Sequence, residues 1–282
     1  MTDLLVGLIG AGIQASRTPA MHEKEGVEQG LRYVYRLIDL ETRNLGAEAL
    51  PELIDAAERE GFNGLNITHP CKQSVIPLLT DLSDDARALG AVNTVVFRDG
   101  KRFGHNTDWW GFAESFRRGL PNAALGHVVQ LGAGGGGAAV AHAALTLGVE
   151  RLTMFDRDED RGRKLASALA VRFGDGRAVA GTDLAKSMSS ADGLIHATPT
   201  GMAKYPGLPL PAALLHPRLW VAEIVYFPLE TELLHAANHL GCRTLNGGGM
   251  AVFQAVEAFR LFTGITPDAA RMQRHFVSMG AH

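Results

Sequence analysis

The feature that most constrains the fold is a glycine turn between two apolar runs. Residues 127–131 read His-Val-Val-Gln-Leu and predict a buried strand. An alanine-rich, apolar segment over 138–147 follows the turn, and a second apolar run over 151–155 ends at Asp156. The turn itself consists of Gly132, Ala133, Gly134, Gly135, Gly136 and Gly137. Strand, glycine turn, helix and strand in this order predict a Rossmann-type βαβ unit, in which a dinucleotide pyrophosphate lies at the helix N-terminus.

The acid that closes the second run bears on the choice of cofactor. Asp156 lies 24 residues after Gly132, close to the spacing of the acid that accepts the ribose hydroxyls in this kind of unit. A carboxylate there repels a 2′-phosphate, so the sequence favours NAD over NADP. Arg157 beside it can pair with that phosphate, which keeps NADP open.

A second glycine turn, over residues 10–15, competes for the same role. The segment Ser16-Arg17-Thr18-Pro19 interrupts the chain where a helix should begin at once, and proline is not accepted inside a helix. The next acid at a strand end, Asp39, lies 29 residues after Gly10 rather than about 20. We therefore predict that the dinucleotide binds at 132–137 and that 10–15 is an ordinary βαβ turn.

The periodicity of the whole chain predicts an α/β fold with two domains. Strands are expected over 4–9, 33–40, 64–68, 91–98, 101–105, 127–131, 151–156, 193–197 and 219–225. Helices are expected over 20–30, 47–60, 72–79, 109–118, 134–147, 161–173, 250–263 and 267–278. Residues 1–108 then form a substrate domain with a mostly parallel sheet, 109–240 a Rossmann-type NAD-binding domain, and 241–282 helices that pack back on the first domain.

Composition excludes several classes of function. The net charge is −3 over 282 residues, so there is no basic surplus for nucleic acid. No apolar stretch approaches the roughly 18 residues of a membrane span. Two cysteines make no disulfide framework, and the histidines show no metal-binding spacing. The N-terminus lacks the basic residues of a signal peptide, so we expect a cytoplasmic protein, either a monomer or a homodimer, without a metal.

Four polar clusters lie where strands of the first domain are expected to end. They are Ser16–Pro19, Asn66–Lys72, Asn93-Thr94 and His105–Asp108. Ligands of open α/β sheets bind beyond the carboxyl ends of the strands. Hydroxyls, amides, one lysine and one aspartate suit a small polyol that carries a carboxylate, and a Lys–Asp pair can take the proton that an alcohol loses as hydride leaves. Each cluster alone also fits helix caps and turns.

Together and in this order, the clusters resemble the shikimate dehydrogenase family, most closely its NAD-dependent quinate/shikimate dehydrogenase branch. The resemblance covers nearly the whole chain. Its further segments are Gly90–Thr94, Ala197–Met202, Val225–Pro228 with Thr231, and Gly247–Met250 with Gln254.

The resemblance implies a role for each matching residue of the first domain. Lys72 acts as the acid/base group or holds the reacting hydroxyl, and Asp108 orients it. Ser16 and Thr18 bind the substrate carboxylate, and Thr18 is typical of members that accept quinate, where many biosynthetic members have serine. The ring hydroxyls are bound by Asn66, Thr68, Asn93 and Gln254, and Tyr226 lies near them.

For the cofactor, the resemblance places the pyrophosphate over Gly134–Gly137. Thr198, Met202 and Val225 lie along the nicotinamide, and Gly247 is close to its ring. His196 stands where the family commonly has asparagine, and Glu223 where it commonly has aspartate.

The activity so implied is reversible hydride transfer from the C3 hydroxyl of quinate or shikimate to NAD, giving 3-dehydroquinate or 3-dehydroshikimate. Three alternatives stay open. They are an NADP-dependent biosynthetic shikimate dehydrogenase, an aminoshikimate-type dehydrogenase, and a nucleotide-binding regulator without activity.

Overall fold

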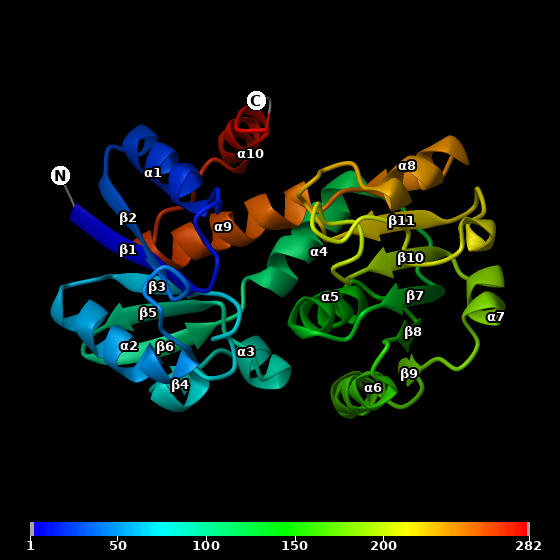
Figure 1. Cartoon of the computed structure of the whole chain (residues 1–282), viewed down its shortest axis with the longest axis horizontal. Coiled ribbons are helices and arrows are strands. Elements are labelled where there is room, and N and C mark those ends of the chain that lie inside the picture. The colour runs from blue at the N-terminus through cyan, green and yellow to red at the C-terminus, as the bar shows by residue number, and fades with distance from the viewer. Residues whose placement is uncertain (1–2, 281–282) are drawn as a thin grey trace. The chain divides into compact units, whose positions relative to one another are not determined.

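A computed structural model describes residues 3–280, and the chain divides into two compact units (Figure 1). Unit 1 combines residues up to 107 with those from 252 onward, and unit 2 comprises 108–251. Residues 1–2 and 281–282, which close the predicted domain ranges, lie outside the described residues. Each unit is built on one six-stranded sheet covered by helices, which confirms the predicted α/β class.

The boundary at which the chain leaves unit 2 lies later in the sequence than we predicted. We placed it near residue 240, but strand β12 (Arg243–Leu245) pairs in parallel with β11 (Trp220–Glu223) in the sheet of unit 2. A three-residue strand is too short to show a period, so the run escaped notice. Residues 241–251 therefore belong to unit 2.

The sheet of unit 1 is mostly parallel, with strand order β2-β1-β3-β5-β6-β4. Its strands are β1 (Asp3–Gly10), β2 (Arg32–Asp39), β3 (Gly64–Ile67), β4 (Asp81–Leu82), β5 (Thr94–Arg98) and β6 (Lys101–His105). Only β5 runs against its neighbours. It turns into β6 through Asp99 and Gly100, both with positive φ (53° and 68°), as expected for a two-residue hairpin turn.

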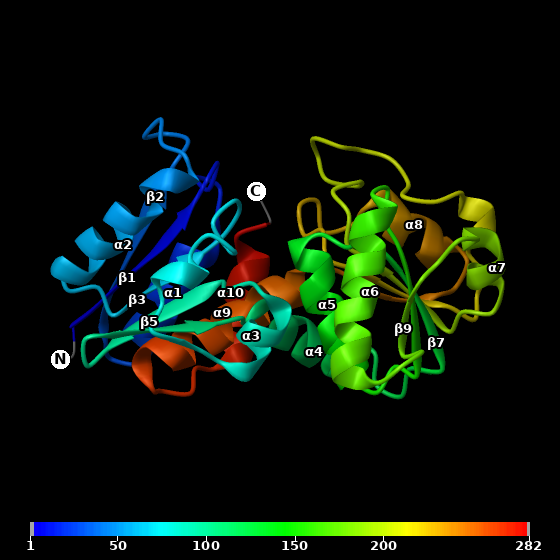
Figure 2. The ribbon, with the colours of Figure 1, turned by 90° about the horizontal axis from the view of Figure 1, so that it is seen from below.

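Helices cover both faces of this sheet. The helices of unit 1 are α1 (Thr18–Glu28), α2 (Leu50–Arg59), α3 (Asp84–Leu89), most of α9 (Gly248–Thr263) and α10 (Ala269–Ser278), with 3₁₀ turns at Ala47–Ala49 and Ile76–Leu78. Figure 2 shows α2 and α9 on opposite sides of the strands. Leu50 and Ile54 of α2 pack on one face, and Phe259 and Phe262 of α9 pack on the other.

One of the helix predictions for this unit is wrong. We expected a brief helix over 72–79, but the structure has only the 3₁₀ turn at Ile76–Leu78. Pro77 lies inside the segment. Its ring disfavours the helical conformation of the residue before it, and its nitrogen offers no hydrogen bond.

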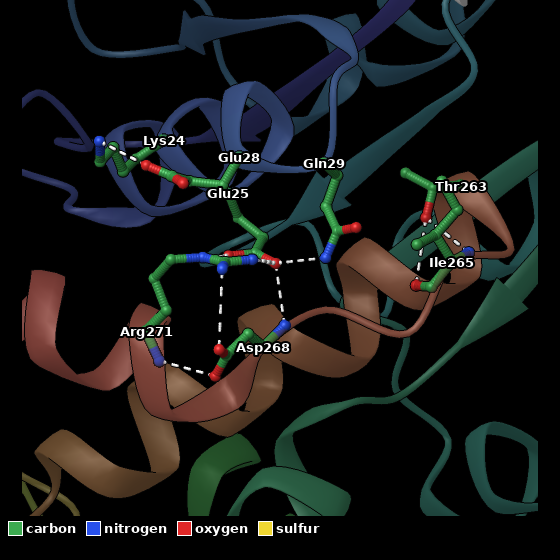
Figure 3. A network of polar contacts seen from close by, with 8 residues as sticks. All are labelled: Lys24, Glu25, Glu28, Gln29, Thr263, Ile265, Asp268 and Arg271. Atoms are coloured by element: carbon green, nitrogen blue, oxygen red, sulfur yellow. Dashed lines mark hydrogen bonds and ion pairs between the residues drawn. The ribbon is translucent and has the colours of Figure 1, made fainter.

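Helix α10 is fastened to α1 by a buried carboxylate (Figure 3). Arg271 donates to both oxygens of Glu25 at 2.7 Å, and Glu25 Oε1 also accepts from Gln29 Nε2 and Asp268 N, each at 2.8 Å. Burial raises the pKa of Glu25, but these donors together outweigh burial and hold its pKa below the ordinary value. Helix α10 is thereby held against α1.

The sheet of unit 2 is parallel throughout, with order β12-β11-β10-β7-β8-β9. Its other strands are β7 (His127–Leu131), β8 (Arg151–Phe155), β9 (Ala178–Ala180) and β10 (Gly193–His196). The chain winds outward from β7 through β8 to β9, and then outward from β10 through β11 to β12. This is the Rossmann order, and its switch point lies between β7 and β10.

The helices of unit 2 form two layers. They are α4 (Asp108–Gly119), α5 (Gly135–Thr146), α6 (Glu159–Phe173), α7 (Leu184–Ser189) and α8 (Glu232–His239), with a 3₁₀ turn at Ala212–Leu214. Side chains of α4, α5 and α6 form one core, and those of α7 and α8 form the other, on the opposite face of the sheet. Among residues 3–280, no helix combines the length and the apolarity that crossing a bilayer requires.

Candidate active site

The polar clusters of unit 1 meet at one edge of its sheet. Strands β1, β3 and β6 are parallel to one another and end there, while the antiparallel β5 begins there. The register places Asn66 opposite Thr94, and Thr94 opposite His105. The carboxyl ends of parallel strands thus bring together segments that are far apart in the chain, since β1 ends at Gly10 and β6 ends at His105.

Buried amides join these segments. Asn66 Nδ2 donates to Thr94 Oγ1 at 3.0 Å, and Asn66 Oδ1 accepts from the Tyr35 hydroxyl at 2.7 Å. Asn93 Nδ2 donates to Thr107 Oγ1 at 3.0 Å, and its Oδ1 accepts from Thr107 N at 2.7 Å. Burial raises the pKa of Tyr35 well above its ordinary value, so its hydroxyl remains a donor. Both asparagines are already engaged within the protein, so the structure shows them first as parts of the framework of this edge.

Five of the predicted residues of unit 1 are half-buried, so part of each side chain is accessible to solvent. Ser16, Thr18, Thr68, Lys72 and Gln254 are all partly exposed. The loop that carries Thr68 is tied to β1 by the bond from Thr68 N to Ile9 O at 2.9 Å. Val92 N donates to Lys72 O at 2.8 Å, which brings the lysine segment beside the segment of Asn93.

Other predicted residues fall in unit 2. Asp108 is the first residue of α4, is 9% exposed and directly follows Thr107. Tyr226 and Met202 are 44% and 39% exposed, and both lie in segments that follow strands of the Rossmann sheet. The predicted residues of unit 1 are Ser16, Thr18, Asn66, Thr68, Lys72, Asn93 and Gln254, whereas Asp108, Tyr226 and the residues predicted to bind the cofactor belong to unit 2.

The glycine turn of unit 2 connects β7 directly to α5 at the switch point. A Cβ on Gly132 or Gly137 would collide with backbone atoms, of Ala197 and of Gly132 respectively. A Cβ on Gly134 or Gly135 would meet nothing within 4 Å. The outer glycines are therefore needed for close packing, and the inner ones leave open space at the N-terminus of α5. That space suits a pyrophosphate held by backbone N–H groups, so these residues fit a dinucleotide.

A buried glutamine in β7 stabilises this turn by hydrogen bonds to its backbone. Gln130 Nε2 donates to Gly132 O at 2.9 Å and to Gly137 O at 2.8 Å, so one amide closes both ends of the turn. Within the part of the chain that the structure describes, no side chain caps α5 at Gly134. We did not assign Gln130 from the sequence, although a polar residue inside an otherwise apolar strand was a signal for it.

Asp156 lies one residue beyond β8 and beside the turn. Its Oδ2 accepts from Ala133 N at 2.7 Å, and its Oδ1 accepts from Asp158 N at 2.9 Å. Arg157 is exposed and makes no ion pair with a residue in the described range 3–280. A carboxylate oxygen has a second lone pair, so Asp156 can hold the turn and still accept a ribose hydroxyl.

The segments predicted to line the nicotinamide lie at the same edge of the Rossmann sheet. Thr198 follows β10 by two residues, and Val225 follows β11 by two. A Cβ on Gly247 would collide with the carbonyl oxygens of Ile224 and Val225. Glycine at 247 therefore allows that segment to pack directly on the end of β11.

Comparison with known proteins identifies the family. The model of the shikimate dehydrogenase substrate binding domain matches residues 8–95, and that of the shikimate 5′-dehydrogenase C-terminal domain matches 247–275. A Streptomyces avermitilis protein named shikimate dehydrogenase (NADP(+)) is 64% identical over 270 residues, covering 95% of this chain and 93% of the relative. The chain belongs to the shikimate dehydrogenase family.

Two further members of the shikimate dehydrogenase family bear on the branch. A Corynebacterium efficiens protein named quinate/shikimate dehydrogenase (NAD(+)) is 51% identical over 281 residues, with 98% of this chain and 99% of the relative covered. The solved structure of Corynebacterium glutamicum quinate dehydrogenase in complex with NAD has a TM-score of 0.93 at 50% identity and covers 98% of this chain and all of that one. The chain is therefore an oxidoreductase that acts on a CH–OH group with a nicotinamide dinucleotide.

Proposed function

We propose that this family member is an NAD-dependent quinate/shikimate dehydrogenase. The observation that carries the proposal is the open glycine turn at the N-terminus of α5, with the carboxylate of Asp156 beside it. The polar edge of unit 1, with Lys72 among amides and hydroxyls, supports a polyol substrate. The relatives named for quinate and shikimate support the same substrate class.

In the reaction we propose, the C3–H bond of the substrate breaks and the C3–O bond becomes a carbonyl. The bound nicotinamide supplies the hydride acceptor. The hydroxyl proton passes to Lys72, which acts as the acid/base group, and Asp108 orients the reacting and neighbouring hydroxyls. Ser16 and Thr18 hold the substrate carboxylate by hydrogen bonds. The amides and hydroxyls of Asn66, Thr68, Asn93 and Gln254 fix the ring hydroxyls, with Tyr226 near the ring.

For the cofactor we propose NAD, bound over Gly132–Gly137 with its adenine ribose on Asp156. Thr198, Met202, Val225 and Gly247 line the nicotinamide side. The second candidate is an NADP-dependent shikimate dehydrogenase. It is favoured by two observations: the NADP-named relative at 64% identity, and the exposed Arg157, which is available to a 2′-phosphate.

The test is a four-way kinetic assay of quinate or shikimate with NAD⁺ or NADP⁺, followed through the absorbance of the reduced nicotinamide. Turnover of both acids with NAD⁺ supports the proposal. Turnover of shikimate with NADP⁺ alone replaces it by the second candidate, and no turnover in any pair overturns both.

Two sets of variants test the assigned roles in the same assay. Lys72→Ala should lower kcat by at least about 100-fold, the usual range for an acid/base group, and wild-type turnover would remove that role. Asp156→Ser should narrow the preference for NAD⁺ over NADP⁺. Arg157→Ala is the matched change next to it and should weaken only NADP⁺; an equal loss with both cofactors would contradict the assignment.

A further inference from the structure

A buried chain of three side chains links the ends of two strands in unit 2. His196 Nδ1 lies 2.8 Å from Glu223 Oε2, and His196 Nε2 lies 2.5 Å from Thr198 Oγ1. His196 and Glu223 are 0% and 1% exposed, whereas Thr198 is only half-buried. The chain therefore begins inside the core and ends at a hydroxyl on the carboxyl edge of the sheet.

The partners of Glu223 determine where the protons lie. Besides His196 Nδ1, the carboxylate accepts from Val225 N at 2.9 Å and from Thr231 Oγ1 at 3.3 Å. A carboxylate can only accept, so His196 carries hydrogen on Nδ1. We assign the neutral tautomer to His196, in which Nε2 is an acceptor and the hydroxyl of Thr198 donates to it. With its proton committed inward, Thr198 Oγ1 offers only lone pairs to a ligand, one of which faces Thr200 N at 3.3 Å.

The same carboxylate fastens a second segment. Glu223 holds Val225 and Thr231, and the segment between them lies against the one that begins at Thr198. A Cβ on Gly201 would lie 3.3 Å from Thr231 Cβ, and Ala203 N donates to Phe227 O at 3.4 Å. One buried acid thus fixes the segments that follow β10 and β11.

We propose that Glu223 and His196 are positioning residues that make Thr198 Oγ1 an acceptor for the carboxamide N–H of the bound nicotinamide. The inference rests on the proposed function, because it places the nicotinamide end of the cofactor at this edge. The nicotinamide carboxamide is the group of that end that carries N–H donors, and a hydroxyl whose proton points into the core is its chemical complement.

The proposal predicts that Glu223→Gln reverses the hydrogen-bond direction of the Thr198 hydroxyl, which a purely structural role does not predict. In Glu223→Gln, the new amide can donate to His196 Nδ1, which moves the ring hydrogen to Nε2. His196 then donates to Thr198, and the threonine proton turns toward the ligand. The hydroxyl is changed from an acceptor to a donor without any change in its position.

The experiment compares the dissociation constants of NAD⁺ and its 3-acetylpyridine analogue, which has a methyl group in place of the carboxamide NH₂. Binding is measured by calorimetry without substrate, so it is independent of turnover. In the wild type, NAD⁺ should bind about tenfold more tightly than the analogue, the value of one hydrogen bond made to a well-placed acceptor. In Thr198→Val and Glu223→Gln that ratio should fall to near one.

Conservative variants keep the test independent of misfolding. Thr198→Ser keeps the hydroxyl and should keep the tenfold ratio. Thr153→Val is the matched control, because it removes another His–Thr hydrogen bond of the same sheet, the one between Thr153 Oγ1 and His127 Nε2 at 2.9 Å. It should leave the ratio unchanged. In a double variant, Glu223→Gln should have no further effect on the ratio once Thr198 is valine.

Each outcome of the binding experiment either supports or overturns the proposal for Thr198. A ratio that stays near ten in Thr198→Val, or that is near one in the wild type, overturns the proposal. A fall in affinity that is equal for both dinucleotides also overturns it, since that is what a purely structural role predicts. Wild-type protein that binds dinucleotide with the expected ratio but turns over no cyclic polyol upholds this inference and refutes the substrate part of the proposed function.

Discussion

In each sheet, a glycine turn follows the strand that comes first in the chain, β1 in unit 1 and β7 in unit 2. The two turns differ in which groups accept hydrogen bonds from their backbone N–H groups. The turn after β1 is closed by the protein itself: Asp39 accepts from Gly12 N at 2.9 Å, Ile13 N at 3.1 Å and Gln14 Nε2 at 3.0 Å. Helix α1 begins only at Thr18. The donors of this turn therefore face an internal anion, and α1 does not begin within the turn.

The turn after β7 is left open. Asp156 takes only one of its N–H groups, that of Ala133, and α5 begins within the turn at Gly135. The comparison teaches that glycines after a strand do not by themselves make a dinucleotide site. The deciding features are where the helix begins and whether a carboxylate of the protein already takes the place of the phosphate.

The largest expected effect comes from the glycines that close the open turn. Gly137→Ala should destabilise unit 2 by about 3 kcal/mol, because its Cβ would collide with the backbone oxygen of Gly132, which cannot move without breaking its bond to Gln130. Chemical denaturation measures the loss. Native stability in this variant would show that the turn can widen, and would remove the structural half of the comparison.

The buried histidine of α1, the helix that follows the closed turn, gives the next largest effect. Burial lowers the pKa of His22 from 6.5 to about 3. Between these values the unfolded chain binds a proton that the folded chain does not. Stability therefore rises with pH across this window and is lost as pH falls from about 6.5, by up to about 1.4 kcal/mol per pH unit.

His22→Gln should flatten this dependence while keeping a polar group for the Tyr33 hydroxyl, which lies 2.9 Å from His22 Nδ1. Denaturation curves at pH 7, 6 and 5 measure the slope. Equal slopes in the variant and the wild type would mean that His22 is not the group that titrates.

Substitution of the carboxylates beside the two turns, Asp39 and Asp156, should have intermediate and opposite effects: the first mainly on stability, the second mainly on NAD⁺ affinity. Burial raises the pKa of Asp39, but the donors around it outweigh burial and hold its pKa below the ordinary value, so the folded unit favours its charged form. Asp39→Asn should lower the melting temperature by several degrees and leave NAD⁺ affinity unchanged. Asp156→Asn should cost less stability and weaken NAD⁺ about tenfold. Thermal melts and calorimetry on both variants check the crossing, and the reverse pattern would exchange the roles of the two turns.

The sequence predicted the parts of this fold that depend on long local patterns. The strand, glycine turn and helix over 127–147 are confirmed, as is the hairpin at Asp99-Gly100. Helices α3, α7 and α8, of six to eight residues, were missed although Ser83, Asp183 and Thr231 cap them by accepting from a backbone N–H three residues on. A capping residue is common outside helices as well, so such a signal is weak without a long periodic segment behind it.

The interactions that the sequence could not predict join residues far apart in the chain. Arg271 and Glu25 are 246 residues apart, and His196 and Glu223 are 27 apart. Asp39 attracted notice only because its spacing was wrong for a ribose, yet its actual role, as the internal anion of the first turn, depends on the register of β1 and β2, where Gly10 lies opposite Asp39. Register and long-range pairing are properties of the assembled sheet, and local patterns carry no information about them.

The smallest expected effect is also the sharpest test of why the inner glycines are there. Gly135 has no positive φ and open space around its Cβ position, so alanine fits it and should raise the stability of unit 2 by about 0.5 kcal/mol. In the proposed function the pyrophosphate approaches the helix at this point, so the added methyl group should lower NAD⁺ affinity about tenfold. In the closed turn, Gly12 has φ +66°, and Gly12→Ala should cost about 1 kcal/mol without changing NAD⁺ affinity. Thermal melts with and without NAD⁺ measure both quantities. An alanine at 135 that leaves affinity intact would mean that the pyrophosphate is bound elsewhere, and that the openness of the second turn is unrelated to the cofactor.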